Sequence, residues 1–363
     1  MTGDAMKWYN PAMPPFKISG FPYFEEDGIY RRLPLNPKCE LPEAVYYLAD
    51  ETAGGQIRFH GKFKKLTLRV SLASRPRYFD LKAKNKAPHL AGTTKFGFDI
   101  YASQGGGEYE FIATTTSFYE DELYYESSPI KTDAGVEADF LINFPLYGAV
   151  DKVLLGFDDE AEISAPEKKF SDDRRIIMYG MSIEQGACAS RPGMCDSNIL
   201  SRWLDCEVIN LGFNSSGKCE AEVAEVISDI ENVSAITVST DGNSPDEVWL
   251  DEKLREFIRI YRKKHPRTPI IVTPSIDGLR DFILKEEHEF RVKMVEAQER
   301  VVNDLRAAGD ENLYLLHEGR EIMNESFEGH ALWHECLVDG CHKTDLGFLW
   351  SAKSLYKLLK ALI

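Results

Sequence analysis

The first 170 residues alternate hydrophobic and polar positions over short stretches. A period of two, or a short continuous apolar run, predicts strands at residues 65–72, 96–101, 109–114 and 153–157. Glycine-containing turns separate these stretches. Because neither a helical pattern nor a lysine follows Gly105–Gly107, we interpret those glycines as a hairpin and not as a phosphate-binding loop. Many short strands at this spacing predict a β-sandwich.

Residues 171–363 show another pattern, in which apolar runs alternate with helical periodicity. Strands are predicted at 174–180, 234–240, 269–273 and 313–316, and helices near 223–230 and at 247–264, 286–308 and 346–362. Such alternation predicts a parallel sheet with helices on both faces. We therefore predict two domains, an all-β sandwich over 1–170 and an α/β/α domain over 171–363. The boundary is expected in the polar stretch Ser164–Asp173.

Composition narrows the range of partners. Among the 363 residues, acidic side chains outnumber basic ones 59 to 43, which gives a formal net charge of −16 at pH 7. This charge repels nucleic-acid phosphates and anionic membranes, so we expect neither partner. The seven cysteines are scattered and odd in number, which argues against a disulfide framework. Since the N-terminus also lacks a signal-peptide pattern, we expect a cytoplasmic protein.

Four polar segments follow predicted strands, and the carboxyl ends of parallel strands share one edge of a sheet. Ser182 follows the strand at 174–180 and begins a helical pattern, where free N–H groups can stabilise an oxyanion. Asp339 precedes His342 by three residues, so its carboxylate could hold one imidazole nitrogen while the other accepts a serine proton. Each feature alone also has a structural interpretation, as a helix cap or a packed histidine.

Two further loops, 209–217 and 240–244, are rich in glycine, asparagine and serine. Backbone N–H groups and the Asn243 amide are the donors that an acyl-transfer site needs for its oxyanion. Each loop alone is most simply a turn. The succession of four such segments at strand ends is what favours acyl-transfer chemistry.

The residues in these segments resemble a known family. Tyr179–Gly193 resembles the nucleophile block of the SGNH (GDSL-like) hydrolases, and Asp339–Phe348 resembles their closing block. Phe16–Gly20 and Tyr30–Pro34 resemble segments of a bacterial branch in which a jelly-roll β-sandwich precedes a flavodoxin-like hydrolase domain. The resemblance spans nearly the whole chain. The architecture it implies is similar to that of carbohydrate esterase family 2, whose members remove acetyl groups from plant polysaccharides.

The resemblance implies roles for individual residues. Ser182 matches the nucleophile, His342 the general base and Asp339 the carboxylate that orients the base. The oxyanion hole would comprise the N–H groups of Ser182 and Ser215 and the side chain of Asn243. The chain departs from the family at Ser215, where a glycine is usual. A serine still offers its N–H but does not easily adopt a positive φ.

The implied function is a serine esterase that needs no cofactor. Its substrate would carry O-acyl groups, expected to be O-acetyl, on a small molecule or an oligosaccharide. Two alternatives stay open: an acyltransferase with the same triad, and a catalytically inactive carbohydrate-binding protein. Trp333 either stacks on a sugar at the mouth of the site or packs under the last helix. The histidines and cysteines of 330–342 fit no zinc-ligand spacing, so no metal site is expected.

Overall fold

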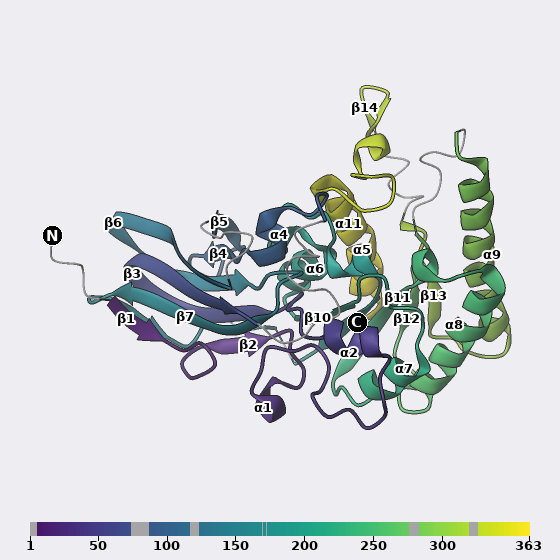
Figure 1. Ribbon diagram of the computed structural model, residues 1–363, viewed down its shortest axis with the longest axis horizontal. Coiled ribbons are helices and arrows are strands. Elements are labelled where there is room, and N and C mark those ends of the chain that lie inside the picture. The colour runs from purple at the N-terminus through teal and green to yellow at the C-terminus, as the bar shows by residue number, and fades with distance from the viewer. Residues whose placement is uncertain are drawn as a thin grey trace.

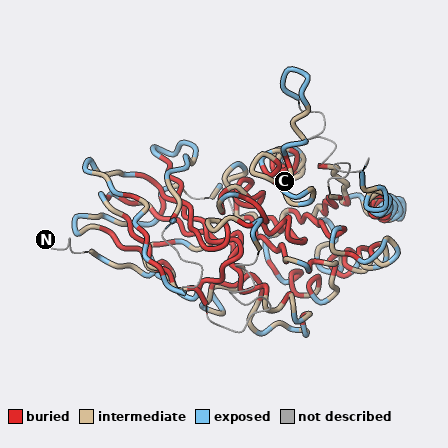
Figure 2. The backbone as a smooth tube through the Cα atoms, turned by 45° about the horizontal axis from the view of Figure 1, so that its top comes forward, coloured by how far each residue is buried: buried red, intermediate tan, exposed pale blue. Residues whose placement is uncertain are grey.

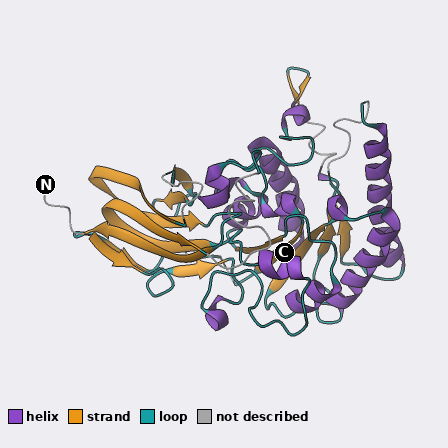
Figure 3. Cartoon of the chain, viewed as in Figure 1, coloured by secondary structure: helices purple, strands orange, loops and turns teal. Residues whose placement is uncertain are grey.

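The computed structural model of the protein describes residues 6–73, 87–116, 123–168, 170–171, 173–275, 283–318 and 326–363. It has two parts, one built on a mainly antiparallel sheet and one on a parallel sheet flanked by helices (Figures 1 and 3). The expectation of a β-rich N-terminal part followed by an α/β C-terminal part is therefore confirmed. The boundary at 170/171 and the jelly-roll topology stay predictions.

Eight strands form the sheet of the N-terminal half. They are β1 (Met6–Tyr9), β2 (Lys17–Ser19), β3 (Gln56–Leu72), β4 (Asp99–Ser103), β5 (Glu110–Thr114), β6 (Tyr124–Asn143), β7 (Val150–Asp158) and β8 (Glu162–Ser164). The order is β1-β7-β3-β6-β4-β5, with β2 and β8 paired to β3. Its core is strongly aromatic, since the Phe59 ring packs on Phe140, Phe157 and Phe16. The antiparallel pairing of β4 with β5 confirms the hairpin at Gly105–Gly107.

This half is not entirely β. It also contains the short helices α1 (Phe24–Asp27), α2 (Glu43–Leu48) and α4 (Gly92–Phe96). The predicted strand 96–101 accordingly begins only at Asp99, because Phe96 is the last residue of α4. Phe96 and Phe98 are buried, and periodicity cannot tell such a short apolar run in a helix end from one in a strand.

The main sheet of the C-terminal half has five strands within the described ranges, all parallel, in the order β10-β9-β11-β12-β13. They are β9 (Arg175–Gly180), β10 (Glu207–Gly212), β11 (Val233–Ser239), β12 (Ile270–Val272) and β13 (Leu313–Leu315). The main helices are α5 (Ser182–Gln185), α6 (Asp196–Leu204), α7 (Ala221–Ile227), α8 (Glu247–Arg262), α9 (Lys285–Ala307) and α11 (Asp345–Leu362). This is the strand order of flavodoxin-like folds.

Successive side chains of β9 point to opposite faces of the sheet, and both faces are buried. Ile177 and Tyr179 pack with α7, α8 and α9, whereas Ile176 and Met178 pack on the opposite face with α6 and α11. Figure 2 shows that long stretches of buried residues run through the interior of both halves. A small hairpin of β14 (Ser326–Phe327) and β15 (His330–Ala331) protrudes from the C-terminal half, and its strands are largely exposed (Figures 1 and 2).

One N-terminal segment packs into the core of the C-terminal half. Leu33, Leu41, Val45 and Leu48, on and around α2, belong to the same apolar cluster as Ile177 of β9. The two halves therefore share a core, although their sheets are separate.

None of the seven cysteines, all of which lie in the described ranges, forms a disulfide bond. None of the helices in the described ranges is long and apolar enough to cross a membrane.

Candidate active site

Ser182 lies at the carboxyl edge of the parallel sheet, directly beyond β9. It is the first residue of α5, and only 8% of its surface is exposed. The turn before it requires a glycine, because a Cβ on Gly180 would lie 2.5 Å from the carbonyl oxygen of Ser239. The strand, turn and short helix thus hold the Ser182 hydroxyl at the edge where ligands bind in folds of this class.

A chain of hydrogen bonds joins the three residues predicted to carry the chemistry. Oγ of Ser182 lies 2.9 Å from Nε2 of His342, and Nδ1 of His342 lies 2.8 Å from Oδ2 of Asp339. The other oxygen of Asp339 accepts the backbone N–H groups of Cys341 and His342 at 3.0 and 2.8 Å. Partial burial tends to raise the pKa of Asp339, but the hydrogen bonds from His342 and Cys341 outweigh it and lower the pKa to about 2.

Backbone contacts join the two ends of the loop that carries His342. Leu337 and Lys343 form an antiparallel bridge, and the carbonyl of His342 accepts the N–H of Val338 at 2.8 Å. Lys343 is buried, and its Nζ donates to Asp196 at 3.0 Å and to Glu318 at 2.9 Å. Burial alone would lower the pKa of Lys343, but these carboxylates hold it well above its usual value. The histidine is thus anchored by a buried ion pair at the next residue.

Another buried carboxyl group, that of Glu184, lies close to the nucleophile in the sequence. Oε2 of Glu184 accepts the N–H of Met181 at 3.0 Å, which fixes the residue that precedes Ser182. Burial raises the pKa of Glu184 to about 8, against the opposing effect of the Lys343 charge. Glu184 is consequently mostly neutral near pH 7.

The two glycine- and asparagine-containing loops meet beside this turn. The N–H of Phe213 donates to the carbonyl of Gly180 at 2.9 Å, and Gly217 approaches that carbonyl so closely that a Cβ would lie 1.9 Å from its oxygen. Asn243 follows β11, and its Nδ2 donates to the carbonyl of Ser216 at 2.6 Å. One N–H of the Asn243 amide is therefore engaged, and the second can serve another acceptor.

Ser215 adopts the conformation that favours glycine. Its φ is +56°, in the left-handed region, and the residue is exposed. The departure from the family pattern thus falls at a position where the loop does require a positive φ. The structure accommodates a serine there at the cost of backbone strain.

Arg32 of the N-terminal half holds the end of β10, from which the Ser215 loop begins. Its side chain is fully buried, and Nη1 donates to the carbonyls of Asn210 and Gly212 at the end of β10. Nη2 donates to the carbonyl of Leu48 at 2.7 Å, and the guanidinium lies over the Phe213 ring at 4.7 Å. The Arg31-Arg32 pair is conspicuous in the sequence, but nothing in its pattern indicates which loop it supports.

The N-terminal half also contacts the nucleophile segment. The Tyr147 hydroxyl donates to the backbone carbonyl of Ser182 at 3.3 Å. Gln185 donates to the carbonyl of Leu146 at 3.0 Å and accepts the N–H of Asn214 at 2.9 Å, so it links the nucleophile helix to the Ser215 loop. These contacts are long-range and have no local sequence signal.

His89 is a further residue that sequence reasoning missed. It lies between β3 and α4 of the N-terminal half, and its ring stacks on that of His342 with centroids 5.5 Å apart. Trp333 lies in a 3₁₀ turn over Leu332–Glu335. Its ring packs against that of His334, with the ring centroids 3.8 Å apart. A role for Trp333 in substrate binding stays a prediction.

Known protein families match both halves of the chain. A model of the GDSL-like lipase/acylhydrolase family matches residues 173–360, and a model of the N-terminus of SGNH-hydrolase-type esterases matches residues 6–163. No curated protein sequence matches the chain.

Several solved structures resemble the whole chain. A protein named as a GDSL-like lipase, from Bacteroides ovatus, is 26% identical with a TM-score of 0.85, over 99% of this chain and 98% of that one. A salicylyl-acyltransferase of a tetracycline biosynthetic pathway is 17% identical with a TM-score of 0.73, over 98% and 97%. A family two carbohydrate esterase from Cellvibrio japonicus is 11% identical with a TM-score of 0.58, over 99% and 98%. The last two likenesses concern the fold alone.

Proposed function

The chain belongs to the GDSL-like lipase/acylhydrolase family, and from this premise we propose that it is a serine esterase in which Ser182, His342 and Asp339 act as a triad. The observation that carries the proposal is the unbroken hydrogen-bond chain from the Ser182 hydroxyl through His342 to the Asp339 carboxylate. A nucleophile, a base and an orienting group in mutual hydrogen-bond reach are the arrangement that activates a serine.

In the first step, Nε2 of His342 accepts the Ser182 proton as Oγ attacks the ester carbonyl. Asp339 stabilises the imidazolium through Nδ1–H, and its low pKa keeps it ionised while it does so. The negative oxygen of the tetrahedral intermediate is held by the N–H groups of Ser182 and Ser215 and by the free N–H of Asn243. Collapse of the intermediate breaks the ester bond, and His342 returns its proton to the departing alcohol.

In the second step, water replaces the alcohol. His342 takes one proton from the water as its oxygen attacks the acyl-enzyme, and the same oxyanion donors act again. Collapse releases the carboxylic acid, and the proton returns to Ser182. Loss of one oxyanion donor typically lowers turnover by about 10²- to 10³-fold, so the position of the strained Ser215 loop matters for rate.

We further propose that the substrate is an O-acetyl ester on a sugar or oligosaccharide. Support comes from the fold that the chain shares along its length with a family two carbohydrate esterase. The large negative net charge also suits a neutral substrate better than a phosphorylated one.

The test is covalent labelling combined with turnover. A fluorophosphonate probe should label the wild type and the Ser171→Ala variant equally, and should not label Ser182→Ala; Ser171 is an exposed serine outside the site. Acetate release from 4-nitrophenyl acetate and from acetylated xylan and mannan oligosaccharides should follow the same pattern. Equal labelling of Ser182→Ala would refute the nucleophile assignment.

An acyltransferase is the second candidate function, because the chain also shares its fold with the salicylyl-acyltransferase. The two functions differ only in the acceptor that attacks the acyl-enzyme. Supplying sugar alcohols during turnover should leave acetate as the main product of an esterase. A transferase would instead divert most of the acyl group to the alcohol.

A further inference from the structure

Three potential metal ligands from distant parts of the chain lie close together, and one of them is the proposed catalytic histidine, His342. One ligand atom from each of His89, Cys188 and His342 lies within 4.8 Å of the other two. His89 is exposed and Cys188 is 9% exposed, so the group has one side open to solvent and one side in the protein. Two imidazoles and a thiol are donors that zinc prefers.

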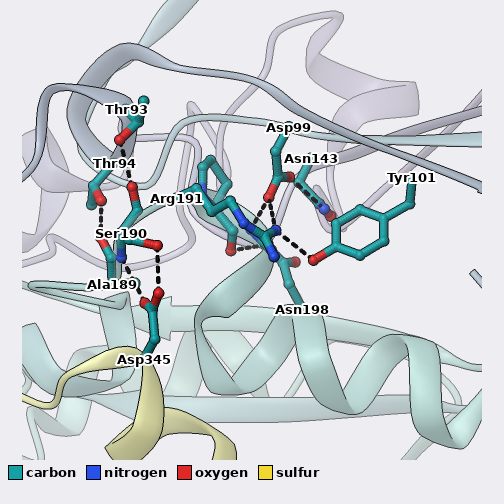
Figure 4. Close-up of polar contacts among 12 residues, drawn as sticks. Thr93, Thr94, Asp99, Tyr101, Asn143, Ala189, Ser190, Arg191, Asn198 and Asp345 are labelled. Carbon is teal, nitrogen blue, oxygen red and sulfur yellow. Dashed lines mark hydrogen bonds and ion pairs between the residues drawn. The ribbon is translucent and has the colours of Figure 1, made fainter. Parts of the chain in front are cut away.

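The backbone around Cys188 is held firmly. Cys188 itself adopts a left-handed conformation with φ of +69°. The next residue, Ala189, accepts a hydrogen bond from the hydroxyl of Thr94, and the N–H of Ser190 donates to Asp345 at 2.8 Å (Figure 4). The segment that carries the thiol is thus held by two elements, α4 of the N-terminal half and α11 of the C-terminal half.

Arg191, three residues after Cys188, also bonds to residues of the N-terminal half. Figure 4 shows Arg191 between Asp99 and Tyr101, with Nη1 at 2.8 Å from Oδ2 of Asp99. Leu90, which follows His89, packs in the same apolar cluster as Cys188. The Cα positions of His89 and Cys188 are therefore set by packing, while the exposed imidazole of His89 can still rotate.

We propose that His89, Cys188 and His342 form a binding site for one zinc ion, and that occupancy of this site switches the esterase off. Nδ1 of His342 is committed to Asp339, so Nε2 is the atom that would bind the ion. Zinc–nitrogen and zinc–sulfur bonds of about 2.0–2.3 Å hold ligand atoms closer together than the 4.8 Å limit within which these three lie, and a rotation of His89 adjusts its own distance to the other two. The thiol releases its proton to solvent when the Zn–S bond forms, and no electron is transferred.

Inhibition follows from competition for one atom. The lone pair on Nε2 of His342 cannot bind zinc and accept the Ser182 proton at the same time. Three protein ligands leave a fourth position of the tetrahedral zinc ion for water. This inhibitory consequence rests on the proposed function, whereas the metal site itself does not. The ligands are separated by 99 and 154 residues along the chain, which explains why motif spacing does not reveal them.

Cobalt binding tests the site without any need for turnover. Co²⁺ added to the wild-type protein should produce the near-ultraviolet absorption of a cobalt–thiolate bond, and added Zn²⁺ should bleach it. Cys341→Ser is the matched control, because this exposed thiol lies next to His342 in the sequence. The band should persist in Cys341→Ser and vanish in Cys188→Ser. A band that vanishes instead in Cys341→Ser, or is absent from the wild type, overturns the proposal.

Measurements of hydrolysis test whether zinc bound at this site inhibits the esterase. Zn²⁺ should inhibit hydrolysis of 4-nitrophenyl acetate, and a chelator should restore it. His89→Ala and Cys188→Ser should each raise the zinc concentration for half-inhibition by at least about tenfold, since loss even of outer-shell support costs that much. Equal inhibition of all variants would place the inhibitory zinc elsewhere. A protein that shows the cobalt band but no hydrolysis would retain the metal site and refute the proposed function.

Discussion

Arg32, near the start of the chain, donates a hydrogen bond from Nη1 to the carbonyl of Gly212, the last residue of β10. The Ser215 loop begins immediately after this carbonyl. A residue of the N-terminal half therefore positions a loop that we assign to the oxyanion hole. Arg32 touches no substrate in this scheme, and we regard it as a positioning residue.

Arg32→Lys should lower kcat by up to about 10²-fold, because a lysine cannot satisfy the separate carbonyls that the guanidinium binds, and small displacements of oxyanion donors are costly. It should also destabilise the fold by about 1–3 kcal/mol for a buried carbonyl left unpaired. Steady-state kinetics and denaturant unfolding measure both effects.

The matched control is Arg31→Lys. Arg31 is equally buried, but it bonds to Asp50 and to the carbonyl of Tyr46 and not to β10. This variant should lose stability while kcat for the folded protein stays close to wild type. A similar loss of kcat in both variants would show that Arg32 acts through general stability alone.

Asp339→Asn should lower kcat by roughly 10⁴-fold, as expected when the orienting carboxylate is lost and the imidazole tautomer changes. The rate of fluorophosphonate labelling of Ser182 should fall in parallel, because that rate also depends on the base. Circular dichroism checks that the loop change does not unfold the protein. Full activity in this variant would reduce the triad to a dyad with another orienting group.

Ser215→Gly tests the strained loop position. A left-handed conformation costs an L-residue roughly 1–2 kcal/mol, and glycine adds about 0.5–1 kcal/mol of chain entropy, so the variant should be about as stable as wild type or up to about 1.5 kcal/mol more stable. Activity should be preserved or increased, because the backbone N–H remains.

Ser215→Ala separates the hydroxyl from the backbone. It removes Oγ but keeps the strain, so it should match wild type in both activity and unfolding. Loss of activity in both variants would mean that the hydroxyl contributes directly, for example by binding substrate.

Glu184 should make stability depend on pH. Its pKa is raised from 4.5 to about 8 by burial, so its contribution to stability is complete below pH 4.5 and is lost as the pH rises through about 8. Glu184→Gln does not titrate but keeps an oxygen for the N–H of Met181. The melting temperature of wild type minus that of Glu184→Gln should therefore fall between about pH 5 and pH 8.5. A difference that is constant with pH would show that Glu184 is ionised in the native state.

The edge that carries the candidate site could be predicted because it depends on local pattern. The predicted strands at 174–180 and 234–240 placed Ser182 and Asn243 at the ends of the neighbouring strands β9 and β11. The expectation that the His342 segment also follows a strand directly is wrong, because the β14–β15 hairpin and the 3₁₀ turn Leu332–Glu335 lie between β13 and His342. Resemblance to the SGNH hydrolases, carried by the two outer blocks, is confirmed by family models over both halves. The catalytic roles themselves stay predictions until they are tested.

What the sequence could not predict depends on contacts between distant residues. His89 reaches His342, and Tyr147 reaches Ser182, across the junction of the halves. Neither has a neighbour in the sequence that signals the contact. The predicted strand at 96–101 includes Phe96, which is the last residue of α4, because so short an apolar run does not show helical periodicity.

The shared core around α2 limits how this protein can be divided. A fragment that begins at residue 171 would lack Leu33, Leu41, Val45 and Leu48, and would present the vacated apolar surface of its sheet to water. A fragment that ends at residue 170 would carry the same side chains without anything to cover them. Shuffling of this hydrolase domain in evolution, or its transplantation by protein engineers, therefore has to treat both halves as one inheritable unit.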